Sequence, residues 1–203
     1  MDNTINNMGS GDTSSKMGAM EMLQAQLEAL KTDADTHTAG GMVGLESDEP
    51  IDDGVYEQIM MFELENEIFG LDILRVQEIR SFNAMTLIPN SPDYIIGMMN
   101  LRGAIVPVIN LRKRFRLQDK EIRETAVIIV LKAYPEDVNQ EKTIGILVDS
   151  VQDAKNVQQD AMQPAPPDHN ARLGEGAVRA LVEVAERMVT ILDLDRIFQG
   201  DFS

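Results

Sequence analysis

The sequence predicts an all-β fold made of two small β-barrels packed on each other and preceded by a tail without a core of its own. About nine or ten short apolar runs, separated by turn residues, fill the stretch from residue 56 to residue 200. The turn signals recur after about 8 to 12 residues, which suits two small barrels better than one large sandwich. Residues 1–55 have no comparable series of runs, so the folded part is expected to begin near Tyr56.

Composition and charge restrict the function classes. The 203 residues include no cysteine, so no disulfide, thiolate metal site or cysteine nucleophile is expected. The two histidines, His37 and His169, have no metal-ligand partner at helical or turn spacing. A formal net charge of −16 disfavours nucleic acid and anionic lipid as partners. No apolar run approaches the roughly 20 residues that cross a bilayer, and no secretory signal is visible, so we expect a cytoplasmic protein without membrane insertion.

The first 55 residues predict a mostly disordered acidic extension with one candidate helix. They carry 11 acidic and 2 basic side chains, and such a composition buries too little apolar surface to offset its ordering entropy. Residues 16–31 are the exception, because four apolar side chains make one stripe on a helix. The stripe fits a helix that frays or packs loosely on its own domain, and it also fits one that docks on a partner or pairs in a coiled coil. Its members are Met20, Leu23, Leu27 and Leu30.

The folded part opens with a predicted hairpin. Two apolar runs, Gln58–Leu64 and Glu67–Ile73, are joined by the two turn residues Glu65 and Asn66. Gly70 marks a bulge or a tight bend within the second run.

A short mixed segment and a turn follow the hairpin. Leu74–Ile79 predicts a helical turn or a strand that leaves Val76 and Glu78 on different faces. Further along, Ser91 and the proline after it have the pattern of an N-cap followed by proline at the first helical position. We therefore predict a one-turn helix at Pro92–Ile96.

The most informative stretch is Ile95–Leu111, which predicts two strands hinged at Arg102 and Gly103. Its second run is rich in β-branched residues, which suits a mostly buried strand rather than a helix. Pro107 places that strand at a sheet edge or a bulge, since proline cannot donate a ladder hydrogen bond. Arg102 is therefore a long cation at a turn tip, which by its local sequence alone is most simply a solvated turn residue.

The rest of the chain predicts strands joined by turns. Two clearly buried strands precede one of alternating polarity that leaves the core, and a last hairpin leads into a short helix. Residues 112–116 hold four cations but lack the interleaved aromatics of a nucleic-acid patch, so they predict a basic helical turn that pairs with the acidic surface. The predicted elements are strands at residues 125–131, 143–148, 149–157, 179–184 and 188–192, an extended loop at 164–167 and a helix at 193–198.

Four segments of the folded part carry a resemblance to a known family. They are Phe69–Arg80, Ile88–Phe115, Thr143–Asp153 and the ending ILDLDRIF. Together they closely resemble CheW, the coupling protein family of bacterial chemotaxis, over nearly all of residues 57–198 and in the same order. The match is specific because the NLRG turn, the segment before it and the PVINLR strand after it occur together. Nothing in residues 1–55 matches, so the resemblance assigns no role to the tail.

The resemblance implies a non-catalytic adaptor of two SH3-like, five-stranded β-barrel subdomains, without cofactor or metal. Members of the family link the cytoplasmic tips of methyl-accepting chemoreceptors to the histidine kinase CheA, which implies these two partners and a place at receptor arrays. A receptor tip would lay a helical face into a groove between the subdomains. The positions that match the family's receptor contacts are Val76, Glu78, Gly97, Arg102 and Gly103. The kinase is expected at barrel ends, around Gly145, Val148 and Val151 and near the loop Lys132–Glu141.

Two alternatives stay open beside this interpretation. The first is a CheW-like scaffold specialised by its tail for another chemosensory pathway or for polar localisation. The second is a standalone β-barrel that binds a small ligand or hydrolyses one with carboxylates such as Asp72 and Asp149. That function would need an enclosed polar pocket with a perturbed pair of acids, and no spacing in the sequence indicates one.

Overall fold

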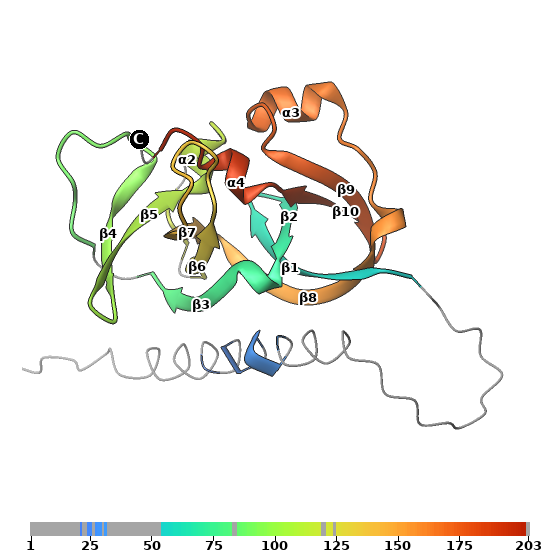
Figure 1. Ribbon diagram of the computed structural model, residues 1–203, viewed down its shortest axis with the longest axis horizontal. Coiled ribbons are helices and arrows are strands. Elements are labelled where there is room, and N and C mark those ends of the chain that lie inside the picture. The colour runs from blue at the N-terminus through green and yellow to red at the C-terminus, as the bar shows by residue number, and fades with distance from the viewer. Residues whose placement is uncertain are drawn as a thin grey trace, which may run out of the picture.

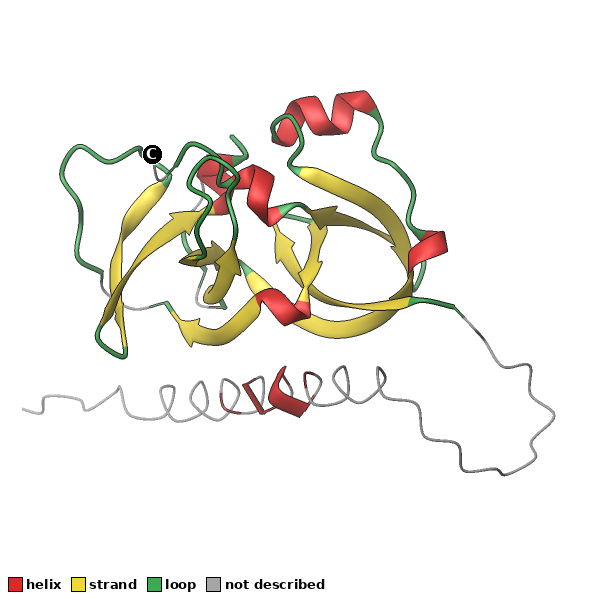
Figure 2. Ribbon diagram, in the orientation of Figure 1, coloured by secondary structure: helices red, strands yellow, loops and turns green. Residues whose placement is uncertain are grey.

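The computed structural model describes residues 21, 24, 25, 27–29, 31, 54–82, 85–118, 121–123 and 125–201. Within this part of the chain, ten strands form two five-stranded sheets that lie next to each other (Figure 1). Sheet A has the strand order β8-β1-β2-β10-β9, and sheet B has the order β3-β6-β7-β5-β4. Both sheets are strongly curved, with short helices at the strand ends (Figure 2). The predicted all-β class and the number of strands are confirmed.

Sheet A contains the first and the last strands of the fold. Its antiparallel pair β1–β2 closes through a two-residue turn, with Leu64 opposite Glu67, so the first predicted hairpin is confirmed. The second hairpin of the sheet is β9–β10, and β8 pairs with β1 on the other side. The strands of sheet A are β1 (Tyr56–Leu64), β2 (Glu67–Asp72), β8 (Ser150–Gln158), β9 (Val178–Val184) and β10 (Arg187–Leu192).

Sheet B is formed by the middle of the chain. The hinge at Arg102 and Gly103 joins β4 to β5 as predicted, and β6–β7 forms the other hairpin of the sheet. The strands of sheet B are β3 (Val76–Ser81), β4 (Ile95–Leu101), β5 (Ala104–Asn110), β6 (Val127–Ala133) and β7 (Lys142–Val148). The helices of the described fold are η1 (Ile73–Arg75), α2 (Leu111–Arg114), η2 (Gln159–Ala161), α3 (Pro167–Leu173) and α4 (Leu194–Ile197).

The same plan builds both sheets. In each sheet a hairpin (β1–β2 or β6–β7) receives a parallel strand (β10 or β5) that belongs to the other hairpin of that sheet. A short helix follows each parallel strand, α4 after β10 and α2 after β5. Both helices begin with a side-chain cap, since Asp193 and Asn110 each accept hydrogen bonds from two amides of the first turn. The segments VINLRKRF and ILDLDRIF are therefore structurally equivalent.

A glycine at the equivalent position of each sheet allows close packing. Gly70 of β2 and Gly145 of β7 each pair with a residue of the parallel strand. A Cβ atom at Gly70 would lie 2.5 Å from Cγ2 of Ile59, and one at Gly145 would lie 2.9 Å from Cγ2 of Ile128. Gly70 was predicted to mark a bulge or tight bend, but the β1–β2 ladder runs through it without a shift in register. Its physical role is to leave room for the side chains of neighbouring strands.

Buried apolar side chains form one cluster inside each sheet and a larger one between the sheets. The largest cluster holds the stacked rings of Phe62, Phe69 and Phe115, whose successive centroids are 5.8 and 5.9 Å apart. Leu27 of the tail belongs to this cluster as well, and the described residues around it are helical. The remaining members of the predicted stripe, Met20, Leu23 and Leu30, lie outside the described residues, as does most of the predicted disordered extension.

One local prediction is wrong, and one short helix was not predicted. The segment Pro92–Ile96 makes a single turn, in which the amide of Ile95 donates to the carbonyl of Pro92 at 3.0 Å, and β4 begins at Ile95 because that residue pairs with β5. The loop predicted at residues 164–167 ends in a helix, α3, whose first residue is Pro167. Helical periodicity could not indicate α3, since Leu173 is its only buried residue. Proline at the start and glycine after the end were the available signals.

Strand β5 departs in part from its prediction. It lies between β7 and β4 in sheet B and is not an edge strand, although Pro107 predicts an edge or a bulge. The parallel ladder with β7 spans only Val108 to Asn110, so Pro107 lies just before it, at a position that pairs with β4 alone. The missing amide hydrogen of proline is therefore tolerated inside the sheet.

The described ladders do not close either sheet into a hydrogen-bonded barrel. One isolated bridge lies between the end strands of each sheet. In sheet A, Gln163 after β8 pairs with Leu181 of β9, and in sheet B, Thr86 after β3 pairs with Met98 of β4. In both cases the first residue of the bridge lies in the segment that follows the other end strand. The two five-stranded sheets are shown, and the SH3-like barrel form stays a prediction. None of the helices in the described part of the chain is long and apolar enough to cross a membrane.

Candidate functional site

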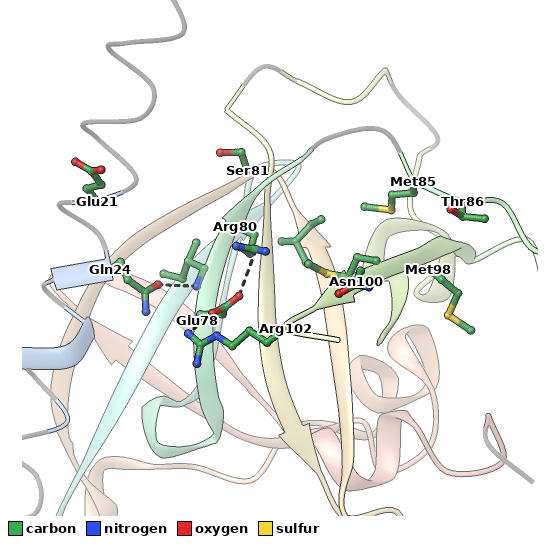
Figure 3. Close-up of a pocket in the computed structure, with 13 residues that line it drawn as sticks. Glu21, Gln24, Glu78, Arg80, Ser81, Met85, Thr86, Met98, Asn100 and Arg102 are labelled. Carbon is green, nitrogen blue, oxygen red and sulfur yellow. Dashed lines mark hydrogen bonds and ion pairs between the residues drawn. The ribbon is translucent and has the colours of Figure 1, made fainter. Parts of the chain in front are cut away.

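A groove of about 620 Å³ opens beside β3 and β4 (Figure 3). Its wall on one side is β3, and β4 with the segment before it forms the other side. Methionine and isoleucine side chains provide the apolar lining, and polar side chains surround it. The lining residues are Glu21, Gln24, Glu78, Ile79, Arg80, Ser81, Met85, Thr86, Met98, Met99, Asn100, Arg102 and Ile128.

A β-bulge in β3 directs Glu78 into this groove. Val76 pairs with Leu131 of β6, whereas Glu78 pairs with Val130, so one extra residue of β3 is accommodated between them. Adjacent residues of β6 point to opposite faces, so the bulge places Val76 and Glu78 on different faces of sheet B, as predicted. Val76 belongs to the cluster between the sheets, while Glu78 lines the groove.

Glu78 is held between two arginines. Nη2 of Arg102 donates to Oε2 of Glu78 at 3.1 Å, and Nε of Arg80 lies 3.3 Å from Oε1 of the same carboxylate. The Glu78 side chain is only 11% exposed, whereas the Arg102 side chain is 86% exposed. An ion pair with so exposed a member contributes little to stability, typically about 0–1 kcal/mol. The pair therefore fixes a charged rim and leaves the guanidinium of Arg102 accessible to a partner.

The hairpin tip that carries Arg102 has a defined shape. Arg102 and Gly103 have φ angles of 51° and 93°, which is the left-handed combination of a two-residue β-hairpin turn. Oδ1 of Asn100 accepts a hydrogen bond of 2.9 Å from the amide of Gly103 and closes the turn. Glycine adopts a positive φ angle without steric strain, so Gly103 suits its position, whereas Arg102 adopts a positive φ angle at a conformational cost.

Gly97 lets the segment before β4 pack closely against β4 in one wall of the groove. It lies at the register shift of the β4–β5 ladder. A Cβ atom there would lie 2.8 Å from the carbonyl oxygen of Thr86 and 2.9 Å from Cβ of Met85. Thr86 makes the isolated bridge with Met98, the next residue of β4. A side chain at position 97 would therefore displace the segment that lines the groove.

The tail reaches the open edge of β3. Oε1 of Gln24 accepts a hydrogen bond of 2.9 Å from the amide of Ile79, and Nζ of Lys31 lies 3.5 Å from the carbonyl oxygen of Gln77. Leu27 lies between these two contacts along the chain and is 2% exposed. The described helical residues of the tail are thus part of this site (Figure 3).

The structure brings together four of the five predicted receptor-contact residues. Glu78 and Arg102 line the groove, Gly103 completes the hairpin tip and Gly97 shapes the opposite wall. Val76 differs, because it is 1% exposed and packs between the sheets. A receptor contact by these residues stays a prediction.

The three residues predicted to contact a kinase occupy a different environment. Gly145 and Val148 lie in β7 and are buried, the first inside sheet B and the second between the sheets. Val151 of β8 is half-buried and packs against the cluster between the sheets. In this structure Gly145 and Val148 present no side chain to a partner, so a kinase contact in this region would involve Val151 or exposed neighbours. That contact also stays a prediction.

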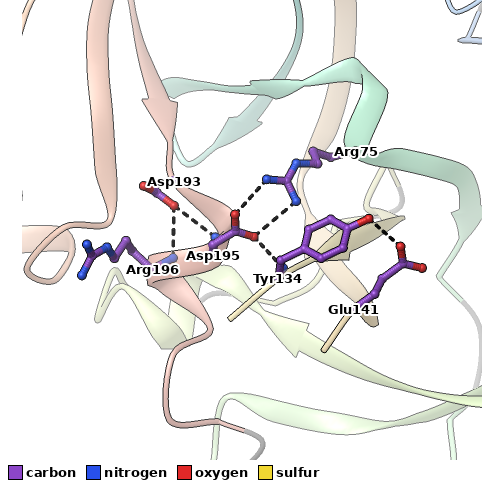
Figure 4. A network of polar contacts seen from close by, with 6 residues as sticks. All are labelled: Arg75, Tyr134, Glu141, Asp193, Asp195 and Arg196. Carbon is purple, nitrogen blue, oxygen red and sulfur yellow. Dashed lines mark hydrogen bonds and ion pairs between the residues drawn. The ribbon is translucent and has the colours of Figure 1, made fainter. Parts of the chain in front are cut away.

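A polar network connects the loop Lys132–Glu141 with α4 (Figure 4). Arg75 of η1 donates both terminal nitrogens to Asp195 of α4, at 3.3 and 2.8 Å, and its guanidinium lies 4.8 Å from the ring centroid of Tyr134. Asp195 also accepts from the amide of Tyr134 at 2.6 Å. The hydroxyl of Tyr134 donates to Glu141, and this bond lowers the pKa of the Glu141 carboxyl, with Lys132 adding to the effect. The same bond raises the pKa of Tyr134.

Another ion pair, between Arg112 and Asp149, is buried where the chain passes from β7 of sheet B to β8 of sheet A. Arg112 of α2 donates to Oδ2 of Asp149, the residue between β7 and β8, and both side chains are less than 10% exposed. The amide of Glu65 donates to the same carboxylate oxygen at 2.7 Å. The predicted basic helical turn at residues 112–116 does pair with acidic groups, and one of them is inside the protein. Asp72 caps η1 by accepting from the amide of Leu74. Neither Asp72 nor Asp149 lines the groove, so they do not form a hydrolytic pair there.

Sequence reasoning missed several residues of the groove. Arg80 lies two residues after Glu78 on the same face of β3, a relation that follows from strand alternation once the strand is assigned. Asn100 precedes a two-residue turn and could have been recognised as its side-chain acceptor. Gln24 and Lys31 share a helix face with Leu27 through spacings of three and four residues. The polar residues of this face indicate the tail contact, whereas the predicted helix rests on the apolar stripe alone.

Comparison with known proteins gives a consistent result. A family model for the CheW-like domain matches residues 58–202. Chemotaxis protein CheW of Klebsiella aerogenes is 36% identical over 147 residues, which are 72% of this chain and 84% of that protein. Probable chemotaxis protein CheW of Rhizobium etli is 30% identical over 141 residues, 70% of this chain and 86% of that protein. The crystal structure of the scaffolding protein TtCheW from Thermoanaerobacter tengcongensis aligns with a TM-score of 0.65 and 29% identity, covering 73% of this chain and 97% of that one.

Proposed function

The chain belongs to the CheW-like family, and from that premise we propose that it is a non-catalytic coupling protein that bridges chemoreceptor tips to a CheA-type histidine kinase. The observation that carries the proposal is the groove beside β3. There, two residues that match the family's receptor contacts, Glu78 and Arg102, meet in an ion pair at a groove lined by both polar and apolar side chains. In this function the protein would act in the cytoplasm, at receptor arrays.

The groove suits an amphipathic helix. Met85, Met98 and Met99 line it together with Ile128, and flexible thioether side chains adapt to apolar surfaces of different shape. A receptor helix would place its apolar face on these side chains, while the exposed guanidinium of Arg102 and the carboxylate of Glu78 fix its register. Charges at a rim mainly set specificity and association rate, so the energy of binding would come from the apolar lining.

The kinase would bind at a separate surface. We place it around Val151 and at the loop Lys132–Glu141, which the network of Arg75, Tyr134 and Asp195 orders. Two separate surfaces on one rigid core let the protein hold both partners at once. This is the physical requirement for transmitting a receptor signal without any chemistry of its own.

The test is assembly of the full-length protein with a chemoreceptor cytoplasmic fragment and CheA, followed by measurement of kinase activity. Arg102→Glu should reduce receptor binding and receptor-controlled kinase activity about tenfold or more, since it reverses the charge of the rim. Arg187→Glu is the matched control, because Arg187 is exposed beside the equivalent hairpin turn of sheet A. Equal effects of the two variants, or normal coupling by Arg102→Glu, would contradict the proposed groove.

A scaffold for a different chemosensory pathway is the second candidate. The observation that favours it is the segment before residue 58, which the family model does not match but which lines the groove through Glu21 and Gln24. In that case the protein would bind one receptor class and its own kinase while failing to couple others. Kinase assays with receptor fragments from different pathways distinguish the two candidates.

A further inference from the structure

We propose that the chain's own N-terminal helix occupies part of the groove beside β3 and competes there, within the same molecule, with the helix of a chemoreceptor. The inference rests on the proposed function, since it takes the receptor to bind in this groove. It adds a role for the tail, to which neither the family resemblance nor the family match assigns one. The tail would set how much of the protein is open to a receptor.

The first support is the open edge of β3. Among the described strands this one ends sheet B and pairs only with β6, so every second amide and carbonyl points away from the sheet. Two of these groups contact the tail, since the amide of Ile79 donates to Gln24 at 2.9 Å and the carbonyl of Gln77 lies 3.5 Å from Nζ of Lys31. The tail therefore covers an edge that would otherwise be left to solvent or to a partner.

The second support is the burial of Leu27. This side chain is 2% exposed and belongs to the cluster that also contains Val76 and Ile79 of β3. Gln24, Leu27 and Lys31 are separated by three and four residues, so they share one helix face. Ala25 and Ala29, on the other side, are exposed. The tail thus presents a polar-apolar-polar face to β3, as a docked amphipathic helix does.

The third support is the overlap with the rim charges. Glu21 and Gln24 line the same groove as Glu78, Arg80 and Arg102, and Figure 3 shows Gln24 hydrogen-bonded at the edge of β3, the strand that carries Glu78 and Arg80. A partner helix that contacted Glu78 and the open edge of β3 would need the space that Glu21 and Gln24 fill. The two helices therefore exclude each other at this end of the groove.

The competition has a simple quantitative form. If the tail is docked about ten times more often than it is free, the apparent affinity of a receptor helix falls about tenfold. Val76 is part of the same prediction. It is buried in this structure and belongs to the same apolar cluster as Leu27, so release of the tail should make it more accessible.

Docking is tested first without any receptor, in the full-length protein, by amide hydrogen exchange followed by NMR. The Ile79 amide should exchange roughly tenfold faster or more in Leu27→Asp than in wild type, because its acceptor on Gln24 is displaced. Gln24→Ala removes that acceptor and leaves Leu27 in place, so it should accelerate exchange even if Leu27→Asp is poorly folded. Ala25→Asp is the matched control, since it adds the same charge on the exposed side of the same helix. Unchanged exchange of the Ile79 amide in both Leu27→Asp and Gln24→Ala would overturn the proposal.

Competition is then measured as the affinity of the same proteins for a soluble receptor cytoplasmic fragment. Leu27→Asp should bind about tenfold more tightly than wild type, and Ala25→Asp should bind as wild type does. Adding Arg102→Glu to Leu27→Asp separates the two ideas. If Arg102→Glu weakens binding but Leu27→Asp does not strengthen it, the tail does not compete and this proposal alone fails. If Arg102→Glu has no effect in the open variant, the proposed receptor groove fails.

Discussion

The chain passes from one sheet to the other twice, and each connecting segment forms an ion pair with a helix. In the first pair the connecting segment supplies the arginine, and in the second it supplies the aspartate. Where β2 leads into β3, Arg75 of the crossing segment meets Asp195 on the helix of sheet A. Where β7 leads into β8, Asp149 of the crossing segment meets Arg112 on the helix of sheet B. Arg112 and Asp195 are equivalent residues, since each is the second residue of its helix.

Each carboxylate also accepts a backbone amide from the turn region of a hairpin. Asp149 accepts from Glu65, the residue after β1, and Asp195 accepts from Tyr134, the residue after β6. The environments differ, because the side chains of Arg112 and Asp149 are 7% and 9% exposed, whereas those of Arg75 and Asp195 are 29% and 27% exposed. The difference teaches that equivalent geometry does not mean equivalent energy. The buried pair is costly to break, whereas the half-buried pair is partly screened by water.

The largest effect should follow from breaking the buried contact. Asp149→Ala leaves the Arg112 charge buried and the Glu65 amide without its acceptor, so we expect the free energy of unfolding to fall by about 3–5 kcal/mol. Urea denaturation followed by circular dichroism measures the change. Adding Arg112→Met should restore a large part of the loss, because the uncompensated charge is then gone. A loss below about 1 kcal/mol in Asp149→Ala would mean that the two crossings are energetically alike.

An intermediate effect should distinguish the two sheets at their equivalent glycines. A Cβ atom at Gly70 would meet Ile59 at 2.5 Å and Ile191 at 2.8 Å, whereas one at Gly145 would meet only Ile128 closer than 3.0 Å. Overpacking of this kind costs typically about 1–3 kcal/mol. Gly70→Ala should therefore lower the thermal unfolding midpoint more than Gly145→Ala does. The reverse order would show that sheet B, and not sheet A, is the more tightly packed half.

The smallest effect should follow from breaking the half-buried contact between Arg75 and Asp195. Asp195→Ala removes the partner of Arg75 and the acceptor of the Tyr134 amide, but water reaches these groups, so the loss should be about 1 kcal/mol or less. The same urea experiment applies, and addition of salt should reduce the difference between variant and wild type. A loss as large as that of Asp149→Ala would show that the network around Tyr134 excludes water and acts as a second buried contact.

Much of the candidate site could be predicted from local patterns. The hinge at Arg102 and Gly103 follows from two apolar runs around a turn residue that tolerates positive φ, and the structure has this hairpin. The separation of Val76 and Glu78 onto different faces was also predicted, and the bulge in β3 accounts for it. Arg80 and Asn100 were missed because they belong to the site only through the groove that they line. That groove forms only when β3 and β4 are brought close together in the folded protein.

Other predictions were limited by what a sequence pattern can carry. Gly145 and Val148 match family positions in the sequence, but only the packing of β7 inside the fold places them out of reach of a partner. The one-turn helix predicted at Pro92–Ile96 was wrong because pairing of Ile95 with β5 outweighs a local capping signal. Helix α3 has too little buried apolar surface to produce a helical period.

The sequence by itself determined the all-β class, the strand and hinge positions and the family, because alternation, turn residues and motif order are properties of short segments. Only the tertiary structure decided the pairing of Arg112 with Asp149, the contact of Gln24 with Ile79 and the burial of Val76. The two contacts join residues that lie 37 and 55 positions apart in the sequence. Their existence depends on how two sheets and a helix pack together, and no local pattern records that packing.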